Sequence, residues 1–393
     1  MMRQYQKIVI WTGIGISLVC SLTMIYLFVW HHREVSTDYQ VSTEAVGQYG
    51  DFIGGVVGTV LSVLLLYFTF SLQREDSDNN AQIYQNQILN EEFFHLLDLY
   101  RDTLKRFVYR SEDEDVGEYH DGKDALVRFL EKMYIDYDAN FRNAAKRREA
   151  INMYVGFYSE QYDVASIYFR TLFRICQVID DSKCEESTKV GYAKILRAQL
   201  THTELAFMRY NAMTSIGVNF RNYINKYNLM KHIQPLDLLE FKQWASHLST
   251  SDKSKGNLTL ISIKGAIKRI MKNSVQNNTV TFNDATKYLL IVESNQSHSE
   301  IKVTIKRKSN VVTPAINTMG WMDQLSKEQI EEIVYFFLYE LFIISNFNMF
   351  NVRRDIKFGN EITEENEEEI ITVSIENKLR QSLRLSYNYY NQK

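Results

Sequence analysis

The sequence predicts a mostly α-helical protein in three parts: a two-helix transmembrane hairpin in residues 1–74, a cytoplasmic helical bundle in residues 75–234, and a small α+β region in residues 235–393. Three observations lead to this fold class. Two long apolar runs lie within the first 74 residues, only two prolines occur in 393 residues, and short alternating runs appear between residues 252 and 308. Proline breaks helix interiors, so its scarcity favours long helices. Alternation of apolar and polar residues is typical of strands.

The apolar run 52–72 predicts a transmembrane helix, around which we expect the rest of the chain to be organised. At about 1.5 Å per residue it would extend about 31 Å, the thickness of a bilayer's hydrocarbon core. Small residues recur at every fourth position and form one helix face, and such a face lets two helices pack closely in lipid. The residues of this predicted packing face and its surroundings are Gly50, Asp51, Gly54, Gly55, Gly58 and Ser62. A plain anchor with incidental glycines is the alternative, and Asp51 either lies at the headgroups or has a gating or sensing role.

Residues 8–30 form a second apolar run and predict the first span. Arg3 and Lys7 precede it without an acidic residue, whereas the loop 31–51 holds one arginine and four acidic residues. Because Lys and Arg favour the cytoplasmic side, we expect both termini in the cytoplasm and the spans in contact with membrane lipids. The two small-residue faces pack either as a hairpin or across subunits, so a homo-oligomer is expected.

The polar part of the chain reads as a series of helices. Helical periodicity covers about residues 73–110, 123–150, 153–180 and 187–228. The three cysteines, Cys20, Cys176 and Cys184, form neither a disulfide framework nor a paired metal motif. We therefore expect a helical bundle with no metal and no cofactor.

Three strings resemble a known family. They are GDFIGGVVGTVLSVLLLYFTFSLQ at 50–73, IYFRTLFRI at 167–175 and YAKILRAQLTHTELAFMRYN at 192–211. Together, over about residues 45–230, they resemble the putative phage abortive-infection family, bacterial defence proteins with two membrane spans. The resemblance implies a role in anti-phage defence, in which the infected cell dies or stops growing before the virus matures. It implies no particular reaction.

Polar residues within the second and third strings have two interpretations. The first is a buried network of arginine and glutamate that ties two helices together, since Glu204 follows Arg197 by seven residues on the same predicted stripe. Alternatively, the side chains line a groove that binds a ligand or a phage component. The residues concerned are Arg170, Arg174, Arg197, Gln199, Glu204 and Asn211.

Signals for an enzyme are sparse. Arg197 and His202 match the R-x4-H spacing of HEPN-like ribonucleases, which would place a phosphate-stabilising cation about one helical turn from a general acid–base. Asp284, Glu300 and Lys302 are reminiscent of a metal-dependent nuclease strand. A P-loop, an HExxH motif and a nucleophile elbow are all missing from the sequence. The sequence therefore does not establish an enzyme, and a membrane-tethered ribonuclease and a scaffold or signalling protein unrelated to phage remain the alternatives.

The C-terminal region contains a basic segment and an acidic run. Residues 252–308 hold eleven Lys and Arg against four acidic residues, and the runs 258–263, 279–282, 288–292 and 301–305 predict strands. The charge suits phosphate on nucleic acid or on anionic lipids, or else an ordinary solvated face. Residues 330–350 predict a buried helix, because they are too short and too interrupted by Glu340 for a third span. The six glutamates of 361–369 are either solvated or cover the basic segment as an autoinhibitory element.

Overall fold

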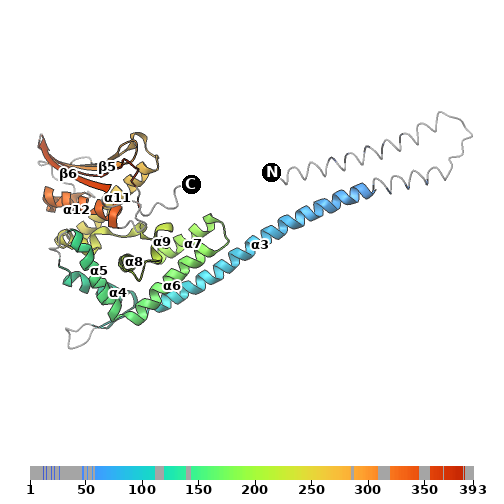
Figure 1. Ribbon diagram of the computed structural model, residues 1–393, viewed down its shortest axis with the longest axis horizontal. Coiled ribbons are helices and arrows are strands. Elements are labelled where there is room, and N and C mark those ends of the chain that lie inside the picture. The colour runs from blue at the N-terminus through green and yellow to red at the C-terminus, as the bar shows by residue number, and fades with distance from the viewer. Residues whose placement is uncertain are drawn as a thin grey trace, which may run out of the picture. The chain divides into compact units, whose positions relative to one another are not determined.

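The computed structural model describes residues 58–110, 119–138, 143–284, 287–308, 319–344, 355–365, 367–383 and 385, together with single positions at 12, 15, 19, 22, 26, 47, 51 and 55. The chain divides into two compact units, residues 1–87 and 88–393. Helix α3 (Gly58–Leu104) contains residues of both units (Figure 1). The fold is mostly helical with a small sheet near the C-terminus, as the sequence predicts.

The predicted membrane spans are covered only in part. Apart from single positions, residues 8–30 lie outside the described residues, as do Gly50 and Gly54. Within the part of the chain that the structure describes, no helix is long and apolar enough to cross a bilayer. The hairpin therefore stays a prediction. Ser62 Oγ donates a hydrogen bond to the Gly58 carbonyl at 2.8 Å, and no atom lies within 4 Å of a Cβ placed on Gly58.

Among the described residues of the second unit, the segment from α3 to residue 245 forms seven further α-helices. After the short antiparallel pair β1 (Val108–Arg110) and β2 (Tyr119–Asp121), they are α4 (Gly122–Asp136), α5 (Asn143–Glu160), α6 (Tyr162–Asp181), α7 (Glu186–Gln199), α8 (His202–Met213), α9 (Phe220–Lys226) and α10 (Lys242–Ala245). Short 3-10 turns connect α9 to α10: η2 (Leu229–His232), η3 (Pro235–Asp237) and η4 (Leu239–Phe241). The continuous helical run expected over 187–228 is wrong, because the chain breaks between α7 and α8 and again before α9.

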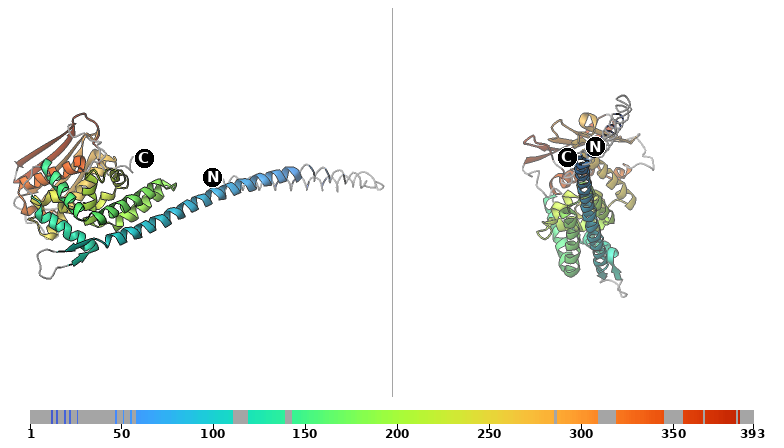
Figure 2. Two further views of the ribbon diagram at one scale, coloured as in Figure 1. Left: turned by 60° about the horizontal axis from the view of Figure 1, so that its bottom comes forward. Right: turned by 90° about the vertical axis from the view of Figure 1, so that its right-hand side faces the viewer.

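A five-stranded antiparallel sheet completes the second unit. Its order is β3-β4-β5-β7-β6, formed by β3 (Thr279–Asp284), β4 (Tyr288–Ser294), β5 (Glu300–Lys308), β6 (Ile356–Glu365) and β7 (Glu368–Asn377). Helix α11 (Thr250–Met271) packs on β3 and β4, and α12 (Lys327–Tyr339) packs on β6 and β7 (Figure 2). Three of the four predicted strand runs are confirmed.

The run 258–263 is not a strand but lies inside α11. Leu260, Ile263, Ile267 and Ile270 are all fully buried, and their spacing of three and four residues places them on one helix face. Ser249 begins the helix by accepting a hydrogen bond from the Asp252 backbone N–H. The local alternation was thus outweighed by a longer helical period.

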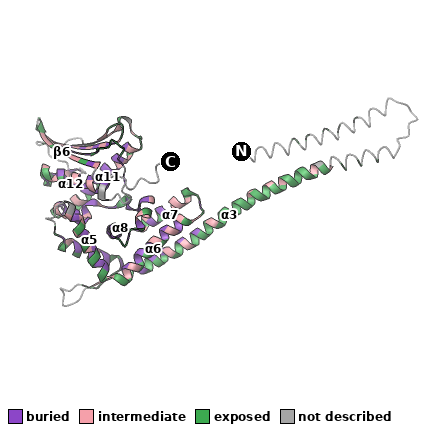
Figure 3. Cartoon of the chain, in the orientation of Figure 1, coloured by how far each residue is buried: buried purple, intermediate pink, exposed green. Residues whose placement is uncertain are grey.

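One hydrophobic core runs through the whole second unit, from Phe93 in α3 to Leu385 (Figure 3). The boundary predicted at residue 235 lies within this unit. The segment predicted as a buried helix is one: Ile330, Ile333 and Phe337 of α12 are buried, and a π-helical turn, Glu340–Ile344, continues it. Residues 345–350 lie outside the described residues.

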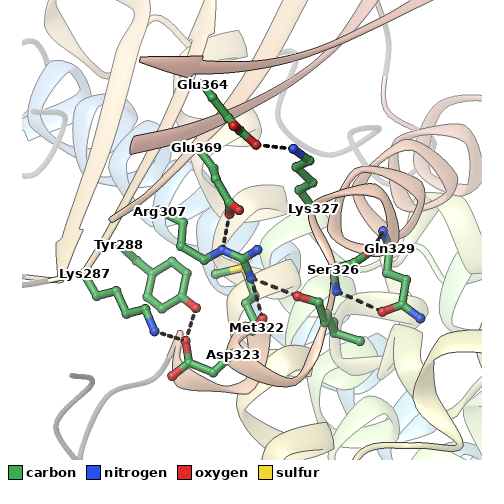
Figure 4. Close-up of polar contacts among 11 residues, drawn as sticks. Lys287, Tyr288, Arg307, Met322, Asp323, Ser326, Lys327, Gln329, Glu364 and Glu369 are labelled. Carbon is green, nitrogen blue, oxygen red and sulfur yellow. Dashed lines mark hydrogen bonds and ion pairs between the residues drawn. The ribbon is translucent and has the colours of Figure 1, made fainter. Parts of the chain in front are cut away.

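The acidic run is an integral part of the sheet. Residues 361–365 belong to β6 and 368–369 to β7, and β7 pairs with β5 so that Arg307 lies opposite Glu369 and Lys308 opposite Glu368. Arg307 also donates through Nη1 to the carbonyls of Met322 (3.0 Å) and Leu325 (2.9 Å), which joins the sheet to the turn before α12 (Figure 4). Since a full strand ladder holds β7 in place, the interpretation of the run as a detachable cover is not supported.

Candidate functional site

Three charged side chains meet inside the second unit. Arg209 of α8 donates from Nη2 to Glu240 Oε1 at 2.9 Å and from Nε to Glu340 Oε1 at 3.0 Å. The Tyr210 hydroxyl donates to Glu240 Oε2 at 2.9 Å. Burial by itself would lower the pKa of Arg209, but Glu240 and Glu340 outweigh it and raise that pKa above its usual value. The guanidinium is therefore a permanent cation that links α8, η4 and the end of α12.

This is a buried arginine–glutamate network of the kind that the sequence predicted, but other residues form it. Arg170 is exposed and donates to the Ser166 carbonyl within α6 at 3.0 Å. Arg174 forms an exposed pair with Glu92 at 3.3 Å. Gln199 accepts a hydrogen bond from Arg101 Nη2 at 3.0 Å. These three predicted site residues make surface contacts within the described structure and do not converge on one groove.

Glu204 has a structural role that explains the break between α7 and α8. Thr201 is the N-cap of α8, and its side chain accepts from the Glu204 backbone N–H while Glu204 Oε2 accepts from the Thr201 backbone N–H. Glu204 Oε1 accepts from the hydroxyls of Tyr100 and Tyr168, the latter at 2.9 Å. Arg197 and Glu204 are thus on different helices, and the stripe predicted from their spacing is wrong. The Thr-x-x-Glu pattern of a capping box was the signal available in the sequence.

Asn211 is buried at the other end of α8. Its Nδ2 donates to the Tyr154 hydroxyl at 2.8 Å, which ties α8 to α5. Gly217 passes so close that a Cβ placed on it would lie 2.2 Å from the Asn211 carbonyl oxygen. Packing accounts for this residue, and no opening for a ligand is needed to explain it.

The predicted pair of Arg197 and His202 is not aligned on one helix, because α7 ends at Gln199 and α8 begins at His202. Arg197 Nη1 donates to the carbonyls of Asn228 (3.3 Å) and Tyr227 (3.5 Å), just after α9. His202 Nε2 lies 3.4 Å from the Thr203 hydroxyl. The spacing that pointed to a ribonuclease therefore does not produce the geometry that the ribonuclease would need.

Arg197 instead belongs to a cluster of cations from three elements. Lys264 of α11 donates from Nζ to the Met230 carbonyl at 3.4 Å, so Arg197 and Lys264 both contact the backbone of segment 227–232. That segment itself carries two basic side chains. After Lys264, another lysine lies in α11 at position 268, and the C-cap residue of the helix is Lys272. We call these six residues the basic cluster: Arg197, Lys231, His232, Lys264, Lys268 and Lys272.

Burial and other cations of the basic cluster lower the pKa values of Lys264, Lys268 and His232. Burial and then Lys268 lower the pKa of Lys264 to about 7, against a smaller opposing effect of Glu340. Burial lowers the pKa of Lys268 to about 8, and Lys231, Lys272 and Arg197 add to the effect. The pKa of His232 is lowered by burial and by Lys231, Arg197 and Lys264. Among the described residues, Lys231, Lys272 and Arg197 act on Lys268, and Lys231, Arg197 and Lys264 act on His232, so positive charge is concentrated here and would attract an anion.

The metal-dependent nuclease strand suggested by the sequence finds no support in the described residues. No group of three His, Cys, Asp or Glu side chains there is arranged to hold a metal ion. Asp284 ends β3 and aligns through Tyr288 with Arg307, whereas Glu300 and Lys302 lie at the opposite end of β5. At about 3.3 Å per residue, the seven residues from Glu300 to Arg307 span about 23 Å. The nuclease-strand interpretation of Asp284, Glu300 and Lys302 is therefore wrong.

The fold and the site define a helical protein that carries a buried ion network and a basic cluster beside a small antiparallel sheet. Residues 160–238 match the model of a family described as Putative phage abortive infection protein. The resemblance predicted from the sequence is confirmed over these residues, which include α6 to α9 and three members of the basic cluster. The similarity of residues 50–73 lies outside the match. Searches of curated proteins and of solved structures found no match to the chain.

Proposed function

We propose that this protein is a membrane-anchored anti-phage defence protein that senses infection in the cytoplasm and arrests or kills the host cell. The observation that carries the proposal is the match of residues 160–238 to the abortive-infection family. The matched residues are structurally central, since they supply Arg209 to the buried network and Tyr168 and Glu204 to the cluster around the start of α8.

Membrane anchoring is proposed from the start of α3. Leu65, Leu66 and Phe70 are about 60 % exposed, which is costly for a row of large apolar side chains in water and favourable in lipid. The first predicted span, the inner-membrane location with cytoplasmic termini, and self-association through the glycine face all belong to this proposal.

A phage challenge tests the proposed function. Cells that express the protein from its own promoter are compared with cells that carry an Arg209→Met/Glu240→Met variant and with cells that lack the protein. We expect fewer plaques with the wild type, together with loss of host growth at high phage input and survival of the culture at low input. RNA integrity is followed in the same cultures, and RNA cleavage would favour the ribonuclease alternative. Equal plaque numbers in all three strains would contradict a defence role and favour a scaffold.

Fractionation tests the anchor separately. Carbonate washing should leave the protein in the membrane pellet, and a C-terminal fluorescent reporter that folds only in the cytoplasm should be bright. Deletion of residues 1–72, which removes both predicted spans, should move the protein to the soluble fraction, whereas Ile135→Glu, a change at an exposed apolar residue of α4, should not. Release of the wild type by carbonate would rule out the anchor without bearing on defence.

A further inference from the structure

We propose that the basic cluster is a binding site for a compact ligand that carries two or more phosphate charges, with Lys231, His232, Lys268 and Lys272 in contact with the phosphates and Arg197 and Lys264 behind them. The inference goes beyond the proposed function, because it assigns a ligand class to a site whether or not the protein acts against phage.

Segment 227–232 is contacted by two cations, Arg197 from a helix before it in the sequence and Lys264 from a helix after it. Arg197 donates to the carbonyls that follow α9, and Lys264 donates to the Met230 carbonyl. Asn228 takes the left-handed conformation with φ 48°, and η2 starts directly after it. Because both carbonyl contacts fix this segment, the side chains of Lys231 and His232 that it carries are held next to α11.

Stabilising backbone carbonyls explains Arg197 and Lys264 but not the rest of the cluster. Lys264 and Lys268 are four residues apart and share one face of α11, and Lys272 is the C-cap residue that ends the helix. The C-terminal end of a helix stabilises a cation, which accounts for part of the cost of Lys268 and Lys272. It does not account for the addition of Lys231, His232 and Arg197 to the same place, since like charges at this separation repel.

The residues of the basic cluster differ in how exposed they are to solvent, and this difference indicates which kind of anion would fit. Lys264 is 7 % exposed, Arg197 and Lys268 are half-buried, and Lys231, His232 and Lys272 are exposed. A ligand would therefore meet an exposed rim of donors around a partly desolvated floor, where charge-assisted hydrogen bonds to phosphate are strongest. A compact oligophosphate matches that concentration of charge. A nucleic-acid strand needs an extended stripe of cations with stacking aromatics, whereas the ring of Tyr227, the aromatic residue at the start of segment 227–232, is buried and so not available for stacking.

Calorimetry with inorganic triphosphate tests the proposal. The full chain, purified in a non-ionic detergent, is titrated near pH 7.5 in two buffers with different enthalpies of ionisation. We expect binding accompanied by net uptake of protons, since a bound anion restores the depressed pKa values of Lys264 and Lys268. Lys268→Met/Lys272→Met should weaken binding about tenfold or more and reduce proton uptake. Lys255→Met, on the same helix but paired with Asp252, should bind like the wild type.

Competition distinguishes the sources of phosphate. Displacement of triphosphate by a nucleoside triphosphate assigns the site to a soluble ligand. Displacement by a short-chain cardiolipin, which carries two phosphates, assigns it to a lipid headgroup, and either result supports the shared chemistry. The proposal is overturned if the wild type does not bind triphosphate, if Lys255→Met and Lys268→Met/Lys272→Met lose equal affinity, or if single-stranded RNA binds and triphosphate does not displace it. Thermal melting of Lys268→Met/Lys272→Met shows whether unfolding causes its loss of affinity. His232→Gln, which keeps Arg197 and Lys264 in place, is a second variant that should bind triphosphate more weakly than the wild type.

Discussion

Arg209 and Glu240 form a salt bridge of 2.9 Å between Nη2 and Oε1, and the two side chains are 1 % and 0 % exposed. They come from α8 and from the turn η4, which are separated along the chain by α9 and two 3-10 turns. Glu340 reaches the same guanidinium from the far end of α12. A single cation thus joins the residues matched by the defence family to the C-terminal region.

Replacing Arg209 should therefore be severe. Arg209→Met leaves two buried carboxylates without their cation, and we expect the free energy of unfolding to fall by about 3–5 kcal/mol. Urea denaturation of the full chain in detergent measures it. Arg128→Met, which breaks an exposed pair with Glu131 at 2.9 Å, should change stability by less than about 1 kcal/mol. Similar losses in the two variants would contradict the importance of burial.

Lys264 predicts a dependence of stability on pH. Its pKa falls from 10.5 in the unfolded chain to about 7 in the folded protein, so the unfolded state binds more protons between these values. The penalty for burying the cation is full below about pH 7 and is relieved as the pH rises toward 10.5. We expect Lys264→Met to raise the melting temperature at about pH 6 and to have a smaller effect at about pH 9.

The comparison for Lys264 is Lys255→Met in thermal melts at both pH values. Lys255 lies at the start of α11 with its side chain 32 % exposed, so its replacement should change the melting temperature much less than that of the buried Lys264. If Lys264→Met destabilises the protein equally at both pH values, the contact with the Met230 carbonyl outweighs the charge, and the predicted sign is wrong.

The start of α8 should be sensitive to changes in its capping box. Thr201→Val keeps the shape of the side chain but removes the oxygen that accepts from the Glu204 N–H, so we expect a loss of about 1 kcal/mol. Glu204→Ala should cost about 3 kcal/mol or more, because it also removes the acceptor of two buried tyrosine hydroxyls. Urea denaturation measures both, with Ser187→Ala at the exposed start of α7 as the control. An equal cost for Thr201→Val and Glu204→Ala would contradict the role of the tyrosines.

Gly217 should not accept a side chain. A Cβ there would lie 2.2 Å from the Asn211 carbonyl oxygen and 2.5 Å from Asn211 Oδ1, so Gly217→Ala should lower the free energy of unfolding by about 1–3 kcal/mol. Gly191 is the matched control, because it lies within α7 with no atom within 4 Å of its Cβ position. Gly191→Ala should be neutral or stabilise the protein by up to about 1 kcal/mol. A stable Gly217→Ala protein would mean that the turn before α9 relaxes easily.

Local sequence patterns predict many of the helices and strands of this fold. Periodicity located the helices, alternation located β3, β4 and β5, and the interrupted apolar run of α12 was recognised as buried. Alternation failed for residues 258–263, where a short alternating run lies within the helical period of α11. Periodicity failed at Thr201, where a capping box ends one helix and begins the next while the apolar pattern continues.

The sequence by itself determined most of the helices and the strands β3, β4 and β5, the surplus of positive charge in 252–308, and the family to which residues 160–238 are similar, because each depends on residues near one another in the chain. Only the tertiary structure decided which charges meet. Arg209 and Glu340 are 131 residues apart, and Arg197 joins Lys264 and Lys268 through packing of α7 against segment 227–232 and α11. Coulomb energy depends on separation in space and on burial, and the order of residues along the chain specifies neither.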